Sequence, residues 1–236
     1  MKPRPSLAVV SIALVAIMGL GGCTASDPER AEAATTSRPA DPATSGVQGA
    51  AHFDEGFVQI GTGEKVVDVY LDAMCPHCRE FEQASMAGLL ADAAAGRTEV
   101  RIHPIAILDR LSLDSRYSTR AAADIVDVAV HHPESVAPVV RALFEHQPAE
   151  GSSGPTDVEL VALISDTTKA DLSGSPMQAA YRSWVTARTA AATTGPLPET
   201  QDIARLLGVP TVIVDGDLYT GPGADGASFS RFYDAR

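Results

Sequence analysis

The sequence predicts an α/β domain in which a long helical segment lies between two groups of strands. Residues 65–71 are β-branched and almost continuously apolar, as in a central strand that is buried on both faces. A helical pattern follows over residues 76–95, and a second strand-like run covers 99–105. Residues 115–207 are then mostly helical, with Pro and Gly between the helical stretches, before strand character returns at 210–214.

Shorter elements complete this pattern. The apolar run 57–60 and the strand 65–71 flank a glycine turn, which predicts two strands ahead of the first helix. Another strand is expected around Leu218 and Tyr219, after a turn. Asp124 and Asp127 are expected on the outer face of a helix. The remaining helices are expected at 121–130, 136–144, 158–164, 177–192 and 229–233.

The composition limits the possible partners. The chain has 236 residues, of which 45% are apolar, and this is enough for a sizeable core. The net charge is −12, and removal of residues 1–22 would take away Lys2 and Arg4 but no acidic residue, leaving about −14. Nucleic acids attract proteins of the opposite sign, so a nucleic-acid partner is not expected.

The N-terminus has the pattern of an export signal. Two basic residues precede the apolar stretch 7–20, which is shorter than the about 20 residues of a permanent membrane span. The stretch ends in Leu20-Gly21-Gly22-Cys23, which resembles the lipobox of bacterial lipoproteins. The resemblance implies a signal peptide over 1–22, cleavage before Cys23, and a lipid anchor on Cys23. The alternatives are an ordinary signal peptide, with Cys23 incidental, or an uncleaved anchor.

Residues 23–50 are expected to form a flexible tether. They are rich in Ala, Thr, Ser, Pro, Gly and charged residues, and they offer too little apolar surface to offset the entropy of ordering. Such a coil spans roughly 25–30 Å. The folded domain is therefore expected over 51–236.

The remaining two cysteines stand in Cys75-Pro76-His77-Cys78, where a predicted strand leads into a predicted helix. Cys75 is expected at the N-cap and Pro76 at the first helical position, which proline favours. The helix dipole, the first-turn amides and His77 would lower the pKa of Cys75, whereas Cys78 lies one turn further in. This arrangement indicates a redox-active pair.

Three other readings of the pair are weaker. Half of a zinc site is disfavoured because no second cysteine pair exists. A haem attachment motif would require histidine at position 79, which is Arg79. A plain structural disulfide between Cys75 and Cys78 stays open as an alternative.

The segment from Tyr70 to Phe81 resembles the active site of DsbA-type thioredoxin-fold oxidases, and a second motif, Gly208-Val209-Pro210-Thr211, matches the same family. The resemblance implies a thioredoxin fold with a helical insertion at about 110–200. It also implies a cis peptide bond at Val209–Pro210, beside the cysteines. One position departs from the family: the acid often buried six residues before the first cysteine is Val69 here. Asp68 and Asp72 are near, but on a strand of period two they are expected to face elsewhere, so water or His77 is expected to handle the proton instead.

The resemblance further implies thiol–disulfide exchange at the extracytoplasmic face of the membrane. Cys75 would form mixed disulfides, Cys78 would resolve them, and His77 would stabilise the Cys75 thiolate. Val209 and Pro210 would present backbone to an extended substrate. The expected partners are exported proteins with reduced cysteines and a membrane reoxidase, and no metal, nucleotide or other cofactor is implied. The alternatives are a reductase or isomerase of the same fold and a non-catalytic binding module.

Overall fold

The computed structural model describes residues 42–170 and 177–236. The signal peptide predicted over 1–22 and the lipid attachment predicted at Cys23 lie outside the described residues. Among the helices of the described residues, none is both long enough and apolar enough to cross a membrane.

The described part of the chain contains one mixed sheet. Its central strand β4 pairs in parallel with β5 and antiparallel with β6, so both of its edges are hydrogen-bonded. The order across the sheet is β1-β2-β3-β5-β4-β6-β7. The strands are β1 (Val47–Gln48), β2 (Ala51–His52), β3 (Phe57–Ile60), β4 (Lys65–Leu71), β5 (Thr98–Pro104), β6 (Thr211–Val214) and β7 (Asp217–Leu218).

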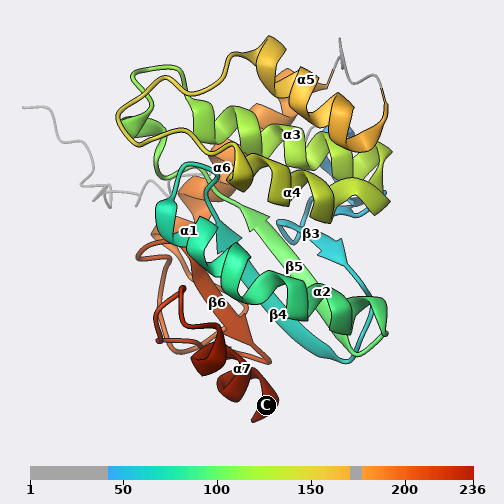
Figure 1. Ribbon diagram of the computed structural model, residues 1–236, viewed down its shortest axis with the longest axis vertical. Coiled ribbons are helices and arrows are strands. Elements are labelled where there is room, and N and C mark those ends of the chain that lie inside the picture. The colour runs from blue at the N-terminus through green and yellow to red at the C-terminus, as the bar shows by residue number, and fades with distance from the viewer. Residues whose placement is uncertain (1–41, 171–176) are drawn as a thin grey trace, which may run out of the picture. The chain divides into compact units, whose positions relative to one another are not determined.

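The helices fall into three groups along the chain. One group follows β4 and, as Figure 1 shows, runs across one face of β4 and β5. A second group forms the predicted insertion between β5 and β6, and one helix closes the chain. The helices are α1 (Pro76–Phe81), α2 (Ala87–Ala94), α3 (Tyr117–His131), α4 (Val136–Glu145), α5 (Asp157–Thr168), α6 (Gln178–Thr194) and α7 (Gly226–Asp234). A π-helical turn, η2 (Glu82–Met86), interrupts the single helix predicted over 76–95.

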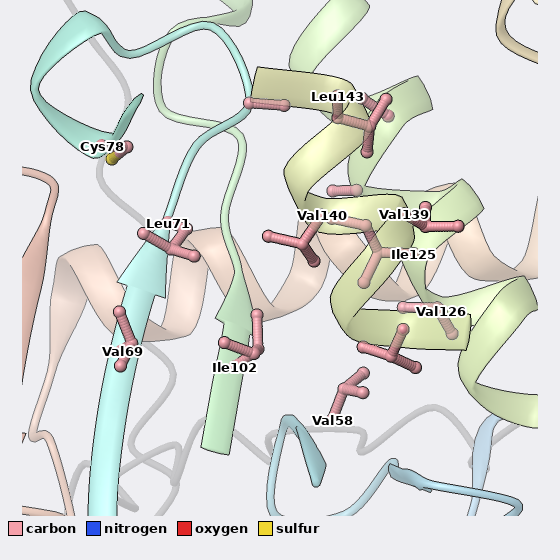
Figure 2. Close-up of a cluster of buried hydrophobic side chains, with 14 of the residues drawn as sticks. Val58, Val69, Leu71, Cys78, Ile102, Ile125, Val126, Val139, Val140 and Leu143 are labelled. Carbon is pink, nitrogen blue, oxygen red and sulfur yellow. The ribbon is translucent and has the colours of Figure 1, made fainter. Parts of the chain in front are cut away.

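The insertion and the sheet share one hydrophobic core. In Figure 2, side chains of α3 and α4 lie against side chains of β3, β4 and β5. Burying each such aliphatic side chain stabilises the fold by roughly 1.5–3 kcal/mol, so the insertion is held firmly against the sheet. The residues labelled there are Val58, Val69, Leu71, Cys78, Ile102, Ile125, Val126, Val139, Val140 and Leu143.

The start of the folded domain differs from the prediction. The tether was expected to reach residue 50, but β1 pairs with β2, and the Ala50 amide donates to the Ala129 carbonyl of α3 at 2.7 Å. Gly49 has φ +57° and lies so close to Ala129 O that a side chain there would collide with it. The missing side chain is what lets this polar stretch dock on α3.

The prediction for Asp124 and Asp127 is wrong. Both side chains are buried, because α3 packs against α4 on one side and α6 on the other. Gln178 of α6 donates to Asp127 Oδ2 at 3.3 Å, and burial is the main cause that raises the pKa of Asp124 to about 7. Polar partners from a distant helix therefore replace the solvent that was expected on this face.

Candidate active site

The redox loop forms where β4 ends and α1 begins. Cys75 is the N-cap residue of α1, with extended φ −78° and ψ 118°, and Pro76 occupies the first turn, both as predicted. The Cys75 carbonyl accepts hydrogen bonds from the amides of Cys78 at 3.1 Å and Arg79 at 3.2 Å. The first turn of α1 is thus built directly on Cys75.

Cys75 and Cys78 are both buried, but as thiols they differ strongly in pKa. The hydrogen bond from the Cys78 thiol, helped by the amides of Cys78 and His77, lowers the pKa of Cys75 to about 7, against the opposing effect of burial. Burial, the hydrogen bond to Cys75 and the charge on Cys75 raise the pKa of Cys78 well above its ordinary value. Near neutral pH, Cys75 is therefore the thiol of the pair that ionises, whereas Cys78 stays protonated.

His77 contributes through its backbone more than through its ring. The imidazole is exposed and Nδ1 lies 2.9 Å from Glu80 Oε2. The hydrogen bond and charge of Glu80 raise the pKa of His77. The backbone amide of His77, by contrast, is one of the groups that lower the pKa of Cys75. The charge of Cys75 is also among the causes that raise the pKa of His77, so stabilisation of the Cys75 thiolate by the ring stays a prediction.

The second predicted motif meets the first. The Val209–Pro210 peptide bond is cis, as expected, and the Cys75 thiol donates to the Val209 carbonyl at 3.3 Å. A cleft of about 360 Å³ extends from this point. A Cβ on Gly223 would lie 3.2 Å from His77 O, which shows how closely the 221–223 segment approaches α1. The cleft is lined by His77, Glu80, Phe81, Val209, Pro210, Val212, Tyr219, Gly221, Pro222 and Gly223.

A buried acid does lie behind the cysteines, at Asp72, so the expectation that Asp72 faces elsewhere is wrong. Val69 is in the core, but Asp72 is fully buried and accepts hydrogen bonds from the amides of Met74 at 2.9 Å and Leu108 at 2.8 Å. Burial is the main cause that raises the pKa of Asp72 to about 6. Its charge in turn raises the pKa of both thiols. The one local signal was an Asp at a strand end, where this residue favours turns.

One group of potential metal ligands occurs among the described residues, away from the redox loop. Ligand atoms of Asp68, His103 and Glu199 lie within 4.8 Å of one another. His103 Nε2 is 2.8 Å from Asp68 Oδ1, and the Tyr70 hydroxyl donates to Glu199 Oε2 at 2.8 Å, so these groups already have hydrogen-bond partners. Tyr70 belongs to a separate apolar cluster with Ile213. We assign no function to this group of residues.

Comparison with solved structures identifies the same architecture elsewhere. Reduced DsbA from Mycobacterium tuberculosis is 24% identical with a TM-score of 0.57, covering 74% of this chain and 98% of that one. Reduced DsbG from the same organism is 24% identical with a TM-score of 0.58, covering 70% and 80%. Oxidised BdbD from Bacillus subtilis is 18% identical with a TM-score of 0.57, covering 80% and 96%. These similarities establish the fold.

Sequence comparison gives a partial match to curated mycobacterial kinases and a match to a family model. The serine/threonine-protein kinase PknE of M. tuberculosis is 32% identical over 114 residues, which are 47% of this chain and only 20% of the kinase. The chain thus matches about a fifth of the length of that relative. The family model described as thioredoxin matches residues 61–232, which include the redox loop and the cis-proline segment. The chain belongs to the thioredoxin family, and with its helical insertion and Cys75–Cys78 pair it has the architecture of a thiol–disulfide oxidoreductase of the DsbA type.

Proposed function

We propose that this protein oxidises the cysteines of exported proteins through a Cys75–Cys78 disulfide. The observation that carries the proposal is the difference between the two thiols: the pKa of Cys75 is lowered to about 7, whereas that of the fully buried Cys78 is raised. A thiol of low pKa is a good leaving group in disulfide exchange, so a mixed disulfide at Cys75 releases its substrate readily.

The reaction transfers two electrons from the substrate to the protein. A substrate thiolate attacks the Cys75 sulfur, a substrate–Cys75 bond forms, the Cys75–Cys78 bond breaks, and Cys78 leaves as a thiolate that takes up a proton. A second substrate thiolate then attacks the substrate sulfur of the mixed disulfide. Cys75 leaves as the stabilised thiolate, the substrate carries the new disulfide, and the protein is left reduced.

The cleft beside Cys75 supports an extended polypeptide as the substrate. Val209 and Pro210 line this cleft, and the Val209 carbonyl oxygen lies 3.3 Å from the Cys75 sulfur. Tyr219 is half-buried and supplies apolar surface along the same cleft. We therefore propose that Val209 and Pro210 present backbone to a substrate segment that carries a cysteine.

We further propose that the protein acts outside the cytoplasm, held at the membrane by a lipid on Cys23. The support is the sequence of residues 1–23, which combines a short apolar stretch with a lipobox-like end. An oxidant that turns over must also pass its electrons on, so a membrane reoxidase is the expected partner.

The test is a direct oxidation assay. Stoichiometric oxidised protein is mixed with a reduced, unfolded secreted protein, and free thiols are counted over time. We expect loss of substrate thiols matched by the appearance of reduced Cys75 and Cys78, with no loss for the Cys75→Ala variant. If the protein instead reduces disulfides of the same substrate under matched conditions, the reductase or isomerase reading replaces this proposal.

A further inference from the structure

Gln147 connects the helical insertion to the redox loop. It is half-buried and lies in the segment between α4 and α5. Its side-chain Nε2 donates hydrogen bonds to the carbonyl oxygens of Ala73 and Cys75, each at 2.9 Å. Both protons of the amide are used in this way, and both acceptors lie in the short connection from β4 to α1.

The Cys75 carbonyl is the point where these contacts converge. It accepts from Gln147 and also from the amides of Cys78 and Arg79, which begin α1. These three donors fix the orientation of the peptide plane that follows Cys75. Because the ψ angle of Cys75 describes that orientation, they also hold ψ at 118°. The direction of the Cys75 side chain relative to the first-turn amides depends on that plane.

Those amides matter for reactivity, because the amides of His77 and Cys78 are among the groups that lower the pKa of Cys75. A hydrogen bond weakens steeply as its geometry departs from linearity, so a small turn of the plane would weaken this effect. Gln147 is neutral, which means that it can hold two carbonyl oxygens without adding a charge beside the thiolate.

We propose that Gln147 is a positioning residue of the redox site, which holds the carbonyls of Ala73 and Cys75 and so keeps the Cys75 sulfur over the first-turn amides. It acts through the backbone of Cys75. The inference does not depend on the direction of electron transfer, because the same geometry sets the reactivity of Cys75 in an oxidase or a reductase. It gives the helical insertion a part in the chemistry of the cysteine pair.

Two variants test the proposal in the full-length reduced protein. Gln147→Met keeps the length of the side chain without its donors, and Gln147→Glu turns a carboxylate toward two carbonyl oxygens. Alkylation of Cys75 by iodoacetamide is followed across pH and assigned to Cys75 by peptide mass spectrometry. We expect the midpoint of the profile to rise by about 0.5–1 pH unit. The plateau rate should rise about twofold to threefold, because a less acidic thiolate is the better nucleophile.

The chain offers a matched control at Gln48, whose Nε2 also donates to two backbone carbonyls, those of Ala43 at 3.4 Å and Ser45 at 3.2 Å. Gln48→Met and Gln48→Glu should leave the alkylation midpoint unchanged even where the melting temperature falls. A folded Gln147→Met protein whose midpoint lies within about 0.2 pH unit of the wild type would overturn the proposal.

A measurement on the wild type keeps the test decisive if the Gln147 variants do not fold. In the reduced protein, the Gln147 side-chain amide protons should exchange slowly with water. Their NMR shifts should also follow the same pH midpoint as Cys75 alkylation. Exchange as fast as that of an exposed glutamine, with no response to Cys75 ionisation, would show that Gln147 does not position the redox loop.

Discussion

Ionisation of Cys75 should make the reduced protein gain stability over the oxidised protein as the pH rises from 7 to 9. The native fold lowers the pKa of Cys75 from 9.0 to about 7, and the residue is only 5% exposed. A lowered pKa contributes stability that is fully present above the unfolded value and is lost as the pH falls through the folded value. The contribution is less than about 1 kcal/mol at pH 7, and it rises to about 2 kcal/mol at pH 9.

Paired urea unfolding of the reduced and oxidised forms at these pH values measures this contribution. Groups that titrate alike in both forms cancel in the difference, whereas the oxidised form has no ionisable sulfur at Cys75 or Cys78. The raised pKa of Cys78 opposes the effect of Cys75, but by less than about 1 kcal/mol up to pH 9 because the thiol ionises in the unfolded chain only near that pH. The difference in unfolding free energy should therefore change by about 2 kcal/mol between pH 7 and 9 in favour of the reduced form. Expressed as a reduction potential, this is about 40 mV, since 30 mV corresponds to about 1.4 kcal/mol for two electrons.

The control is the reduced Cys75→Ala variant, compared with the oxidised wild type over the same range. Its difference in unfolding free energy should be nearly flat with pH, because the titrating thiol is gone. A flat wild-type difference, or an equal slope in the variant, would show that the fold does not depress the pKa of Cys75.

Three further predictions follow from the same structure. Cys78→Ala should accumulate mixed disulfides through Cys75, whereas Cys75→Ala should trap few because Cys78 is fully buried; equal trapping on non-reducing gels would contradict the assigned roles. Cys23→Ala should abolish acylation and release the protein from membrane fractions, and mass spectrometry that finds an unmodified mature N-terminus elsewhere would refute the anchor. Leu143→Ala should lower the free energy of unfolding by about 2–5 kcal/mol because Leu143 is buried in the core that joins α4 to the sheet, whereas Leu207→Ala, at an exposed position, should change it by less than about 0.5 kcal/mol.

Local signals account for what the sequence predicted well. The strand predicted over 57–60 coincides with β3 and the strand predicted over 65–71 coincides with β4. Both predictions depend only on short hydrophobic runs bounded by turn residues, which indicate buried strands. The N-cap at Cys75 and the helical position of Pro76 also follow from a few adjacent residues. The cis bond at Val209–Pro210 was found through a motif rather than through periodicity.

Contacts between distant segments account for what the sequence could not predict. Asp124 and Asp127 look like solvent-facing acids within their own helix, and only the packing of α6 against α3 shows that they are buried. Asp72 stands just beyond a strand, where the period-two rule no longer fixes the direction of a side chain. Its partner Leu108 is 36 residues away, so no local pattern could identify it as the buried acid.

Opposing effects on the pKa of Cys75 limit how strongly oxidising the Cys75–Cys78 disulfide is expected to be. The groups that lower the pKa of Cys75 are adjacent in sequence, but burial and the charge of Asp72 oppose them, and the result is a pKa of about 7. The thiolate then favours the reduced form by less than about 1 kcal/mol at pH 7, against about 2 kcal/mol that a four-residue disulfide loop gains by restricting the unfolded chain. We therefore expect a mild oxidant. The proposed oxidation of exported proteins would still be downhill, because structural disulfides of secreted proteins typically have potentials below about −300 mV, lower even than the about −270 mV of thioredoxin. The direction of exchange is then set by the stability of the disulfide formed in the substrate, and the reactivity of Cys75 sets its rate.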